Sequence, residues 1–335
     1  MTPPRRPALE TGKLPSELLA ALLSAFPAPS PEVRIGARIG EDASAIDVPD
    51  GTLVVAADPI TLTTSDVGRL AVLVNANDVA VCGARPRWFL AVVLVPPATS
   101  EQEIRELFAV LQATVEVVGA SIVGGHTEIT AAATQPVVFG AMLGITERGA
   151  IVETAGLVPG DVLLQVRPVP IEGAAVLASE AAERLADVDG GILVQACAAL
   201  DDPGISVVEP ALLATRLAAT ALHDPTEGGL LMGLHEMAAA GGVALRVDPD
   251  AVLWFEPGVA VCTALGADPW STLASGTLLA TFPKEIVHEA TAAFEAAGHA
   301  VSVLAWVEPG RGVVSSDGTQ MPPRERDEVA RVLAS

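Results

Sequence analysis

The chain has 335 residues, of which 50% are hydrophobic, and a formal net charge of −22. This length and apolar content allow one large or two ordinary domains with a sizeable core, and they exclude wholesale disorder. The acidic balance argues against a general nucleic-acid-binding protein, because phosphate backbones are bound by Lys and Arg. It does not exclude a bound nucleotide, since bound Mg²⁺ can reverse the electrostatic field of a single cleft.

The cysteines and the N-terminus predict the compartment. The three cysteines lack the spacing of a zinc site, so we expect buried thiols in a reducing compartment at Cys82, Cys197 and Cys262. The N-terminal Met-Thr-Pro-Pro-Arg-Arg is unlike a signal peptide. The apolar run at residues 70–81 is interrupted by polar residues and is too short to cross a bilayer. The sequence therefore predicts a cytoplasmic protein without membrane association.

Residues 1–30 are expected to form an N-terminal arm, which is rich in proline and contains a short amphipathic helix at Ser16–Phe26. After the arm, the strand Ile35–Ile39 leads into the loop Gly40-Glu41-Asp42-Ala43-Ser44. Asp50-Gly51 is typical of a hairpin turn. The strand Leu53–Ala57 then delivers Asp58 at its end, where binding and catalytic carboxylates are commonly placed.

The next segment, residues 67–83, is apolar almost all round and predicts a buried helix. Asn75 and Asp78 lie three residues apart on one face of this helix. Burying an unpaired carboxylate is costly, so Asp78 should have a partner such as a metal, a cap or a hydrogen-bond network. A strand at Trp88–Val95 follows, and Ser100 with Glu103 forms the capping box of another helix.

The stretch Val123–Thr130 is the most suggestive of the first half. A strand is expected to end at Gly124-Gly125, and imidazole, hydroxyl and carboxylate groups follow directly at His126, Thr127 and Glu128. Paired glycines let a backbone approach a ligand closely, and these polar groups could meet a phosphate, a metal or a reacting atom. His126 alone is more often a structural hydrogen-bonding residue than a catalyst. A strand at 136–145 completes this half.

A boundary is expected between domains at 31–155 and 156–335, near the turn Pro159-Gly160-Asp161. The second half begins with a strand at 162–166 and helices at 171–185 and 192–200. The polar glycine loop His223-Asp224-Pro225-Thr226-Glu227-Gly228-Gly229 then enters a helix at Leu230–Ala240. Such a loop at a helix N-terminus suits an anionic ligand, although His223-Asp224 alone could equally be an ordinary turn. A helix at 283–298 and a strand at 300–307 follow.

The chain carries none of the common nucleotide or hydrolase signatures. It has no Walker A motif, no G-x-G-x-x-G and no nucleophile elbow, and His235-Glu236 lacks the second histidine of a zinc motif and is interpreted as a helix-surface pair. Single acidic residues at turns are often caps or solvated groups. Four at loop and strand ends beside small residues are instead typical of Mg²⁺ shared with a polyphosphate: Glu41, Asp42, Asp58 and Asp78.

In this order, the motifs resemble the superfamily that contains aminoimidazole ribonucleotide (AIR) synthase (PurM), the hydrogenase maturation protein HypE, selenophosphate synthetase and thiamine-monophosphate kinase. The resemblance covers nearly all of residues 12–310 and is closest to the HypE-like or AIR synthase-related branch. It is carried by residues 39–46, 58, 74–80, 83–86 and 124–128, and in the second half by 159–161, 171–174, 223–229 and 275–277.

The resemblance implies an α+β, two-domain PurM-like fold in which the N-terminal domains of a homodimer pair to form a β-barrel, each followed by a C-terminal α+β domain. ATP would lie in the cleft and Mg²⁺ would bridge acidic residues and phosphates. By motif, the metal ligands would be Asp42, Asp58 and Asp78, and the catalytic residues Asp58, His126 and Asp224. The nucleotide would be contacted by Gly40, Asp42, Asn75, Gly124, Gly125, Thr127, Gly228 and Gly229.

The chain departs from the family patterns at three places. HypE ends in Pro-Arg-Ile-Cys, whereas this chain ends in Arg331-Val332-Leu333-Ala334-Ser335, so carbamoyl dehydration in the HypE manner is not expected. His126 stands where HypE and thiamine-monophosphate kinase usually have Asp. The selenophosphate branch expects a reactive Cys followed by a lysine near the N-terminus, and only Lys13 is present.

Three functions remain open. The leading one is ATP- and Mg²⁺-dependent transfer of the γ-phosphate to an oxygen of a small carboxylate, amide or phosphate. The second is a catalytically reduced nucleotide-binding regulator or a partner protein in hydrogenase maturation. The third is a kinase similar to thiamine-monophosphate kinase. The sequence does not identify the acceptor substrate.

Overall fold

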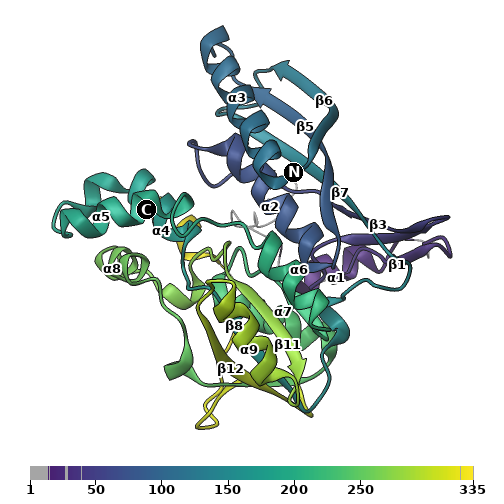
Figure 1. Cartoon of the computed structure of the whole chain (residues 1–335). Helices are drawn as coiled ribbons and strands as arrows, with labels where there is room; N and C mark the ends of the chain where they lie inside the picture. Colours follow the sequence, from purple (N-terminus) through teal and green to yellow (C-terminus); the bar gives the residue numbers. More distant parts are fainter. Residues whose placement is uncertain (1–13, 15, 27–28, 39, 325, 335) are drawn as a thin grey trace, which may run out of the picture.

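The chain folds into two α+β units, each built around one mixed β-sheet (Figure 1). The structure is a computed structural model that describes residues 14, 16–26, 29–38, 40–324 and 326–334. Lys13 and Ile39 lie outside the described residues, and of the predicted arm at 1–30 the structure describes the helix α1, Ser16–Leu23. The predicted two-domain α+β architecture is confirmed, whereas the exact boundary at 155 and the dimeric barrel stay predictions.

The first sheet has the strand order β1-β2-β3-β7-β5-β6, with β4 also paired to β7. Only β5 and β6 run parallel, and β6 lies at the edge. The predicted hairpin at Asp50-Gly51 is confirmed, with Val48 opposite Gly51. The strands are β1 Val33–Ile35, β2 Ser44–Val48, β3 Gly51–Ala56, β4 Pro59–Ile60, β5 Arg85–Val95, β6 Ser121–Ile129 and β7 Val137–Thr146.

The second sheet has the order β13-β10-β12-β8-β11-β9, in which only β10 and β13 run parallel. Its central strand β8 is buried along its whole length, and its buried polar residues Asp161 and Gln165 form hydrogen bonds. The strands are β8 Asp161–Val166, β9 Ala221–His223, β10 Ala244–Val247, β11 Leu278–Pro283, β12 Val301–Glu308 and β13 Gly312–Ser315.

Helix α2, Val67–Val81, joins the two units. It packs against β7 and α3 (Glu101–Val118) of the first unit and against α6 (Val208–Arg216) and β9 of the second. Nearly every residue of α2 is buried, as its apolar sequence predicts. The polar residues that α2 carries are therefore held rigidly between the units. The capping box predicted at Ser100 and Glu103 starts α3 and is confirmed.

The remaining helices form two groups. Helices α7 (Gly229–Gly241) and α9 (Val287–Ala296) pack on the second sheet. Four others share a core of their own and form a lobe beside it (Figure 1): α4 Glu172–Glu180, α5 Gly190–Cys197, α8 Glu256–Ala264 and α10 Glu328–Leu333. No helix among the described residues is long and apolar enough to cross a membrane.

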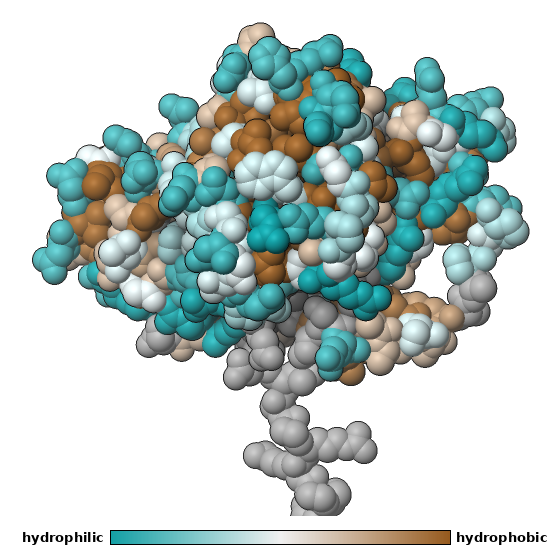
Figure 2. Space-filling view, turned by 90° about the horizontal axis from the view of Figure 1, so that it is seen from below, coloured by the Kyte–Doolittle hydropathy of each residue, from teal (hydrophilic) through white to brown (hydrophobic). Residues whose placement is uncertain are grey.

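The prediction that all three cysteines are buried is wrong for Cys197. Cys82 and Cys262 are buried, but Cys197 is exposed on α5, near the exposed Val194. Apolar residues also gather at the end of the molecule where this lobe lies (Figure 2). In the sequence, a short apolar helix on the surface cannot be distinguished from a core helix, because apolar content alone does not show which face other residues cover.

The prediction that a strand ends before Gly124 is also wrong, because β6 runs through Gly124, Gly125 and His126 to Ile129. The glycines mark an irregularity of the sheet. Ile122 pairs with Phe89 and Gly124 with Leu90, so Val123 is an extra residue. Gly125 has a φ of 148°, and a Cβ there would lie 1.9 Å from the carbonyl oxygen of Ala91. Close approach to β5 explains this glycine without a ligand.

Candidate active site

Four aspartates from four segments come together where the two units meet. Asp42 precedes β2, Asp58 follows β3, Asp78 lies on α2, and Asp224 follows β9. Burial raises the pKa of Asp78 well above its usual value, and the charges of Asp224, Asp58 and Asp42 raise it further. Burial and the neighbouring Asp42 and Asp58 likewise raise the pKa of Asp224. The structure therefore brings together all four aspartates that were predicted from the sequence.

Two of these carboxylates have oxygens without a partner among the described residues. Asp78 is 4% exposed and Asp224 is 1% exposed. The Oδ2 atom of Asp78 and both carboxylate oxygens of Asp224 are buried without a hydrogen-bond donor. Unpaired buried carboxylates are expensive, so groups of this kind hold a proton or face a cation. A hydrogen bond with Asp58 also raises the pKa of Asp78, but no described protein atom is a partner for its Oδ2.

Asn75 fixes the backbone that carries Asp58. Its side-chain oxygen accepts a hydrogen bond from the backbone N–H of Asp58 at 2.9 Å. Its amide donates to the carbonyl oxygens of Asp58 at 3.2 Å and of Ala71 at 2.8 Å. Both amide protons are thus engaged within the protein. The geometry makes Asn75 a positioning group for the end of β3.

His223 links the two units beside the aspartates. Its Nδ1 lies 2.9 Å from Oδ2 of Asp42, and its Nε2 lies 3.0 Å from Oε2 of Glu236 on α7. Burial alone would lower the pKa of His223, but the two carboxylates hold it well above its usual value. An imidazole between two acceptors must carry both protons to satisfy them. We call Asp42, His223 and Glu236 the latch.

The latch corrects the interpretation of Glu236 as part of a surface pair with His235. Glu236 faces His223, while His235 Nε2 lies 2.7 Å from the carbonyl oxygen of Met321. Gly40 also packs here, since a Cβ on it would lie 3.0 Å from the carbonyl oxygen of Glu236. No spacing in the sequence predicts this contact. Its residues, 40, 42, 223 and 236, are far apart in the sequence and belong to two units.

His126 does not reach the aspartates within one chain. His126 is opposite Val92 on β5, Val92 is opposite Phe139 on β7, and Phe139 is opposite Pro59 on β4. Three strand spacings, about 14 Å, therefore separate His126 from the neighbour of Asp58. The side chain of His126 is 65% exposed and lies 3.4 Å from Glu128. Gly124, Gly125 and Thr127 share this exposed strand.

The N–H groups predicted to bind phosphate at α7 already have acceptors. The N–H of Gly228 donates to Oδ2 of Asp327 at 2.7 Å, and the N–H of Gly229 donates to the carbonyl oxygen of Thr226 at 3.0 Å. Asp327 comes from the C-terminal part of the chain and was not predicted as a site residue. Its distance of 99 positions from Gly228 explains why sequence patterns could not indicate the contact.

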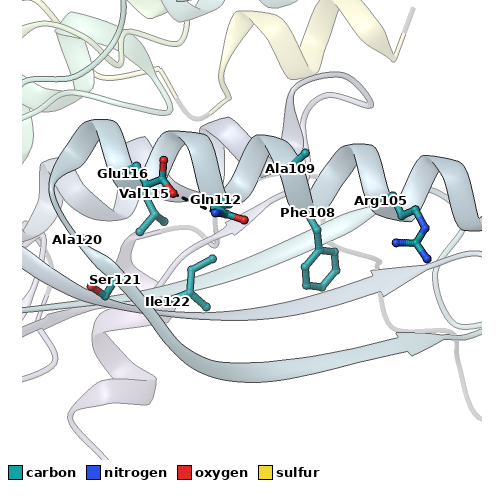
Figure 3. Close-up of a pocket in the computed structure, with 9 residues that line it drawn as sticks. All are labelled: Arg105, Phe108, Ala109, Gln112, Val115, Glu116, Ala120, Ser121 and Ile122. Atoms are coloured by element: carbon teal, nitrogen blue, oxygen red, sulfur yellow. Dashed lines mark hydrogen bonds between the residues drawn. The ribbon is translucent and has the colours of Figure 1, made fainter.

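A groove of about 590 Å³ lies away from the aspartates, between α3 and β6 (Figure 3). Phe108 of α3 and Ile122 of β6 face it from opposite sides, with Arg105 at one end. None of the predicted site residues lines this groove. The candidate active site is therefore the aspartate cluster between the units.

Whether the aspartate cluster can bind Mg²⁺ depends on which other ligands complete the coordination of the ion. Within the part of the chain that the structure describes, no three His, Cys, Asp or Glu side chains are placed to hold a metal ion on their own. Mg²⁺ seldom uses such a cage, because it keeps several waters and is usually held by one or two carboxylates together with substrate phosphates. The unpartnered Oδ2 of Asp78 fits a site shared in this way, and the unpartnered oxygens of Asp224 lie beside it.

The fold and the aspartate cluster define a two-domain protein of a known family. The AIR synthase related protein N-terminal domain matches residues 40–146, and the AIR synthase related protein C-terminal domain matches residues 158–317. The chain belongs to the AIR synthase related family, which confirms the resemblance seen in the sequence.

Its relatives include hydrogenase maturation proteins. The putative hydrogenase expression/formation protein MJ0676 of Methanocaldococcus jannaschii is 24% identical over 280 residues, which cover 82% of this chain and 81% of that protein. The carbamoyl dehydratase HypE of Rhodobacter capsulatus is 29% identical over 243 residues, which cover 71% of this chain and 68% of that protein. The chain is thus a distant HypE-like member of the family.

Solved structures share the fold. Escherichia coli HypE has a TM-score of 0.72 at 22% identity, covering 94% of this chain and 99% of that chain. HypE in complex with ATP has a TM-score of 0.70 at 22% identity, covering 86% and 90%. ThiL complexed with AMPPCP and TMP has a TM-score of 0.72 at 18% identity, covering 92% and 94%. At these identities the likeness is one of fold.

Proposed function

We propose that this protein is an ATP- and Mg²⁺-dependent enzyme that transfers the γ-phosphate of ATP to an oxygen of a small substrate. The observation that carries this proposal is the pair of buried, unpartnered carboxylates, Asp78 and Asp224, contributed by the two units. Two buried carboxylates beside Asp42 and the exposed Asp58 need a cation, and a polyphosphate brings Mg²⁺ with it. A relative named carbamoyl dehydratase HypE and a structure of HypE in complex with ATP support the same class.

Each aspartate has a proposed role. Asp42, Asp58 and Asp78 would hold Mg²⁺, which neutralises charge on the phosphates when bound. Asp224 would accept any proton that the attacking oxygen carries, while the γ-phosphoryl group passes to that oxygen and ADP leaves. The latch fixes Asp42, and Asn75 fixes Asp58, so the chain supplies position as well as charge.

The roles predicted for the β6 residues require a homodimer. All nine residues of β6 are exposed, and Ile122, Val123 and Ile129 place apolar side chains on this edge. Exposed apolar edge strands pair readily with another chain. Pairing of β6 with a second copy would build the β-barrel expected for the family, and His126 and the segment Gly124–Thr127 would act only in that assembly.

A second candidate is a nucleotide-binding partner protein in hydrogenase maturation, without phosphoryl transfer. The names of the relatives favour it, because they include a hydrogenase expression/formation protein and several HypE proteins. The fold likeness to ThiL leaves thiamine monophosphate as an acceptor to be tested.

The test is phosphorus NMR of the protein with ATP and Mg²⁺, first alone and then with thiamine monophosphate and other small acceptors. The proposal expects slow phosphate release alone and a new phosphorus signal with one acceptor. Asp58→Asn and Asp78→Asn should each reduce turnover at least tenfold, while Asp250→Asn, at an exposed position, should not. Tight binding with ATP left intact under every acceptor would favour the partner protein instead.

A further inference from the structure

The C-terminal segment, which we define as residues 321–324 and 326–334, is anchored along the second unit. The carbonyl oxygen of Met321 lies 2.7 Å from His235 Nε2 on α7. Arg324 forms an ion pair with Asp268 at 2.8 Å. Arg331 donates to the carbonyl oxygen of Gly266 at 2.7 Å. The segment is thus held at both ends, and its middle is placed against the loop that carries Asp224.

Asp327 makes the contact between the segment and that loop. Its Oδ2 accepts a hydrogen bond from the N–H of Gly228 at 2.7 Å, and its Oδ1 accepts one from the N–H of Val329 at 2.7 Å. The side chain is almost entirely buried. One carboxylate therefore caps α10 with one oxygen and holds the N-cap residue of α7 with the other.

The loop has little freedom to adopt another shape while this contact is present. Gly228 has a φ of 85°, and a Cβ on Gly229 would lie 2.6 Å from the carbonyl oxygen of Trp270. The carbonyl oxygen of Thr226 accepts from the N–H of Ala274 at 3.2 Å. Asp224 lies four residues before Gly228, inside the turn that these contacts define.

We propose that Asp327 is a positioning residue that holds the loop 224–229 so that Asp224 points into the aspartate cluster, which makes the C-terminal segment part of the active site. This inference rests on the function proposed above. A purely structural role would be limited to capping α10. The two roles use different oxygens of the same carboxylate, so substitutions can separate them.

Two substitutions, Asp327→Ser and Asp327→Ala, separate the capping role from the positioning role. Serine is a good N-cap and can replace the bond to Val329, but its shorter side chain cannot also reach Gly228. Alanine loses both bonds. The matched control is Asp189→Ala, which removes an N-cap aspartate from α5, where it accepts from Gly191 and Ile192 away from the site. Three readouts apply to the full chain: the thermal midpoint, Mg·ATP affinity with steady-state phosphate release, and hydrogen–deuterium exchange of the peptide 224–232.

We expect Asp327→Ser and Asp327→Ala to lower kcat for phosphate release equally, by about tenfold, since displacements near 1 Å can cost up to about 100-fold. The affinity for Mg·ATP should stay within about threefold, because its proposed ligands lie in the first unit. Asp327→Ala should lower the thermal midpoint further than Asp327→Ser, because only alanine also loses the cap of α10. Peptide 224–232 should exchange faster in both Asp327 variants.

A kcat for Asp327→Ser within twofold of the wild type, with unchanged exchange of 224–232, would reduce Asp327 to a helix cap. A kcat that falls only in Asp327→Ala would lead to the same conclusion. If the wild-type protein turns over no ATP, the proposed function fails, and the exchange of 224–232 alone decides the contact: unchanged exchange in Asp327→Ser overturns it.

Discussion

Two groups of charged side chains between the units share Asp42, and they differ in how their charges are satisfied. In the latch, His223 is held by Asp42 and Glu236, so both ring nitrogens have partners. In the aspartate cluster, Asp78 and Asp224 keep buried oxygens without donors. A satisfied network stabilises and fixes a structure, whereas an unsatisfied one destabilises the protein until a ligand arrives. The latch is built for structure and the cluster for binding.

The largest effect should come from breaking the latch. His223→Ala leaves the carboxylates of Asp42 and Glu236 mostly buried and without their shared partner, which should cost about 3 kcal/mol of unfolding free energy. Denaturant unfolding measures this cost, with His288→Ala at an exposed position as the control. A loss below about 0.5 kcal/mol, the size of an ordinary surface change, would show that the latch contributes little to stability.

Neutralising the cluster should do the opposite to stability. Asp78→Asn removes a carboxyl group whose ionisation is opposed by burial and by the neighbouring carboxylates, so the unfolding free energy of the ligand-free protein should rise by about 1 kcal/mol at pH 8. Mg·ATP affinity should fall at least tenfold, about 1.4 kcal/mol. If Asp78→Asn lowered the unfolding free energy and kept its Mg·ATP affinity, the cluster would serve stability rather than binding, which would contradict this comparison.

Two further buried carboxylates predict how stability depends on pH. Burial raises the pKa of Glu172 to about 7 and that of Asp327 to about 7. The folded protein therefore holds protons on these groups that the unfolded chain has released above about pH 4. Stability is fullest below the unfolded pKa and is lost as the pH rises toward 7, at up to about 1.4 kcal/mol per pH unit for each group.

Glu172→Gln tests this dependence, because glutamine resembles the protonated acid. Its unfolding free energy should fall less steeply than that of the wild type between pH 5 and pH 7, by up to about 1 kcal/mol per pH unit. Glu285→Gln, at an exposed position, serves as the control. Equal slopes for the wild type and Glu172→Gln would mean that Glu172 is charged throughout this range.

The smallest effect on folding should come from the edge of the first sheet. Val123→Lys on β6 should change the unfolding free energy of a single chain by about 0.5 kcal/mol or less. It should nevertheless shift the mass seen by sedimentation from dimer to monomer, since a lysine blocks edge pairing. Val194→Lys on α5 is matched in exposure and chemistry but should leave the mass unchanged. A wild-type protein that sediments as a monomer would contradict the proposed dimer.

The elements that were predicted best depend on local patterns. The apolar run of α2, the capping box at Ser100 and the Asp50-Gly51 hairpin are all set by neighbours in the sequence, and each is confirmed. The helices α6 and α8 were not predicted; each carries a proline in its first turn, Pro210 and Pro257, where proline is tolerated.

The predictions that failed depended on distant contacts. The strand was predicted to end at the glycines of β6, but it continues through them, and Gly125 is required by its approach to Ala91 on a neighbouring strand. The partners of His223 and Gly228 come from other parts of the chain, at Asp42, Glu236 and Asp327. The aspartates of the site could be found from the sequence, because each follows or lies in a recognisable element. The groups that position them could not.

The most direct test of the central claim is a calorimetric titration of ATP into the wild-type protein and into Asp78→Asn, with Mg²⁺ and with EDTA. The account predicts tight binding to the wild-type protein only when Mg²⁺ is present, and binding at least tenfold weaker to Asp78→Asn. ATP binding that is the same in Mg²⁺ and in EDTA, or unaffected by Asp78→Asn, would show that the buried aspartates serve another ligand.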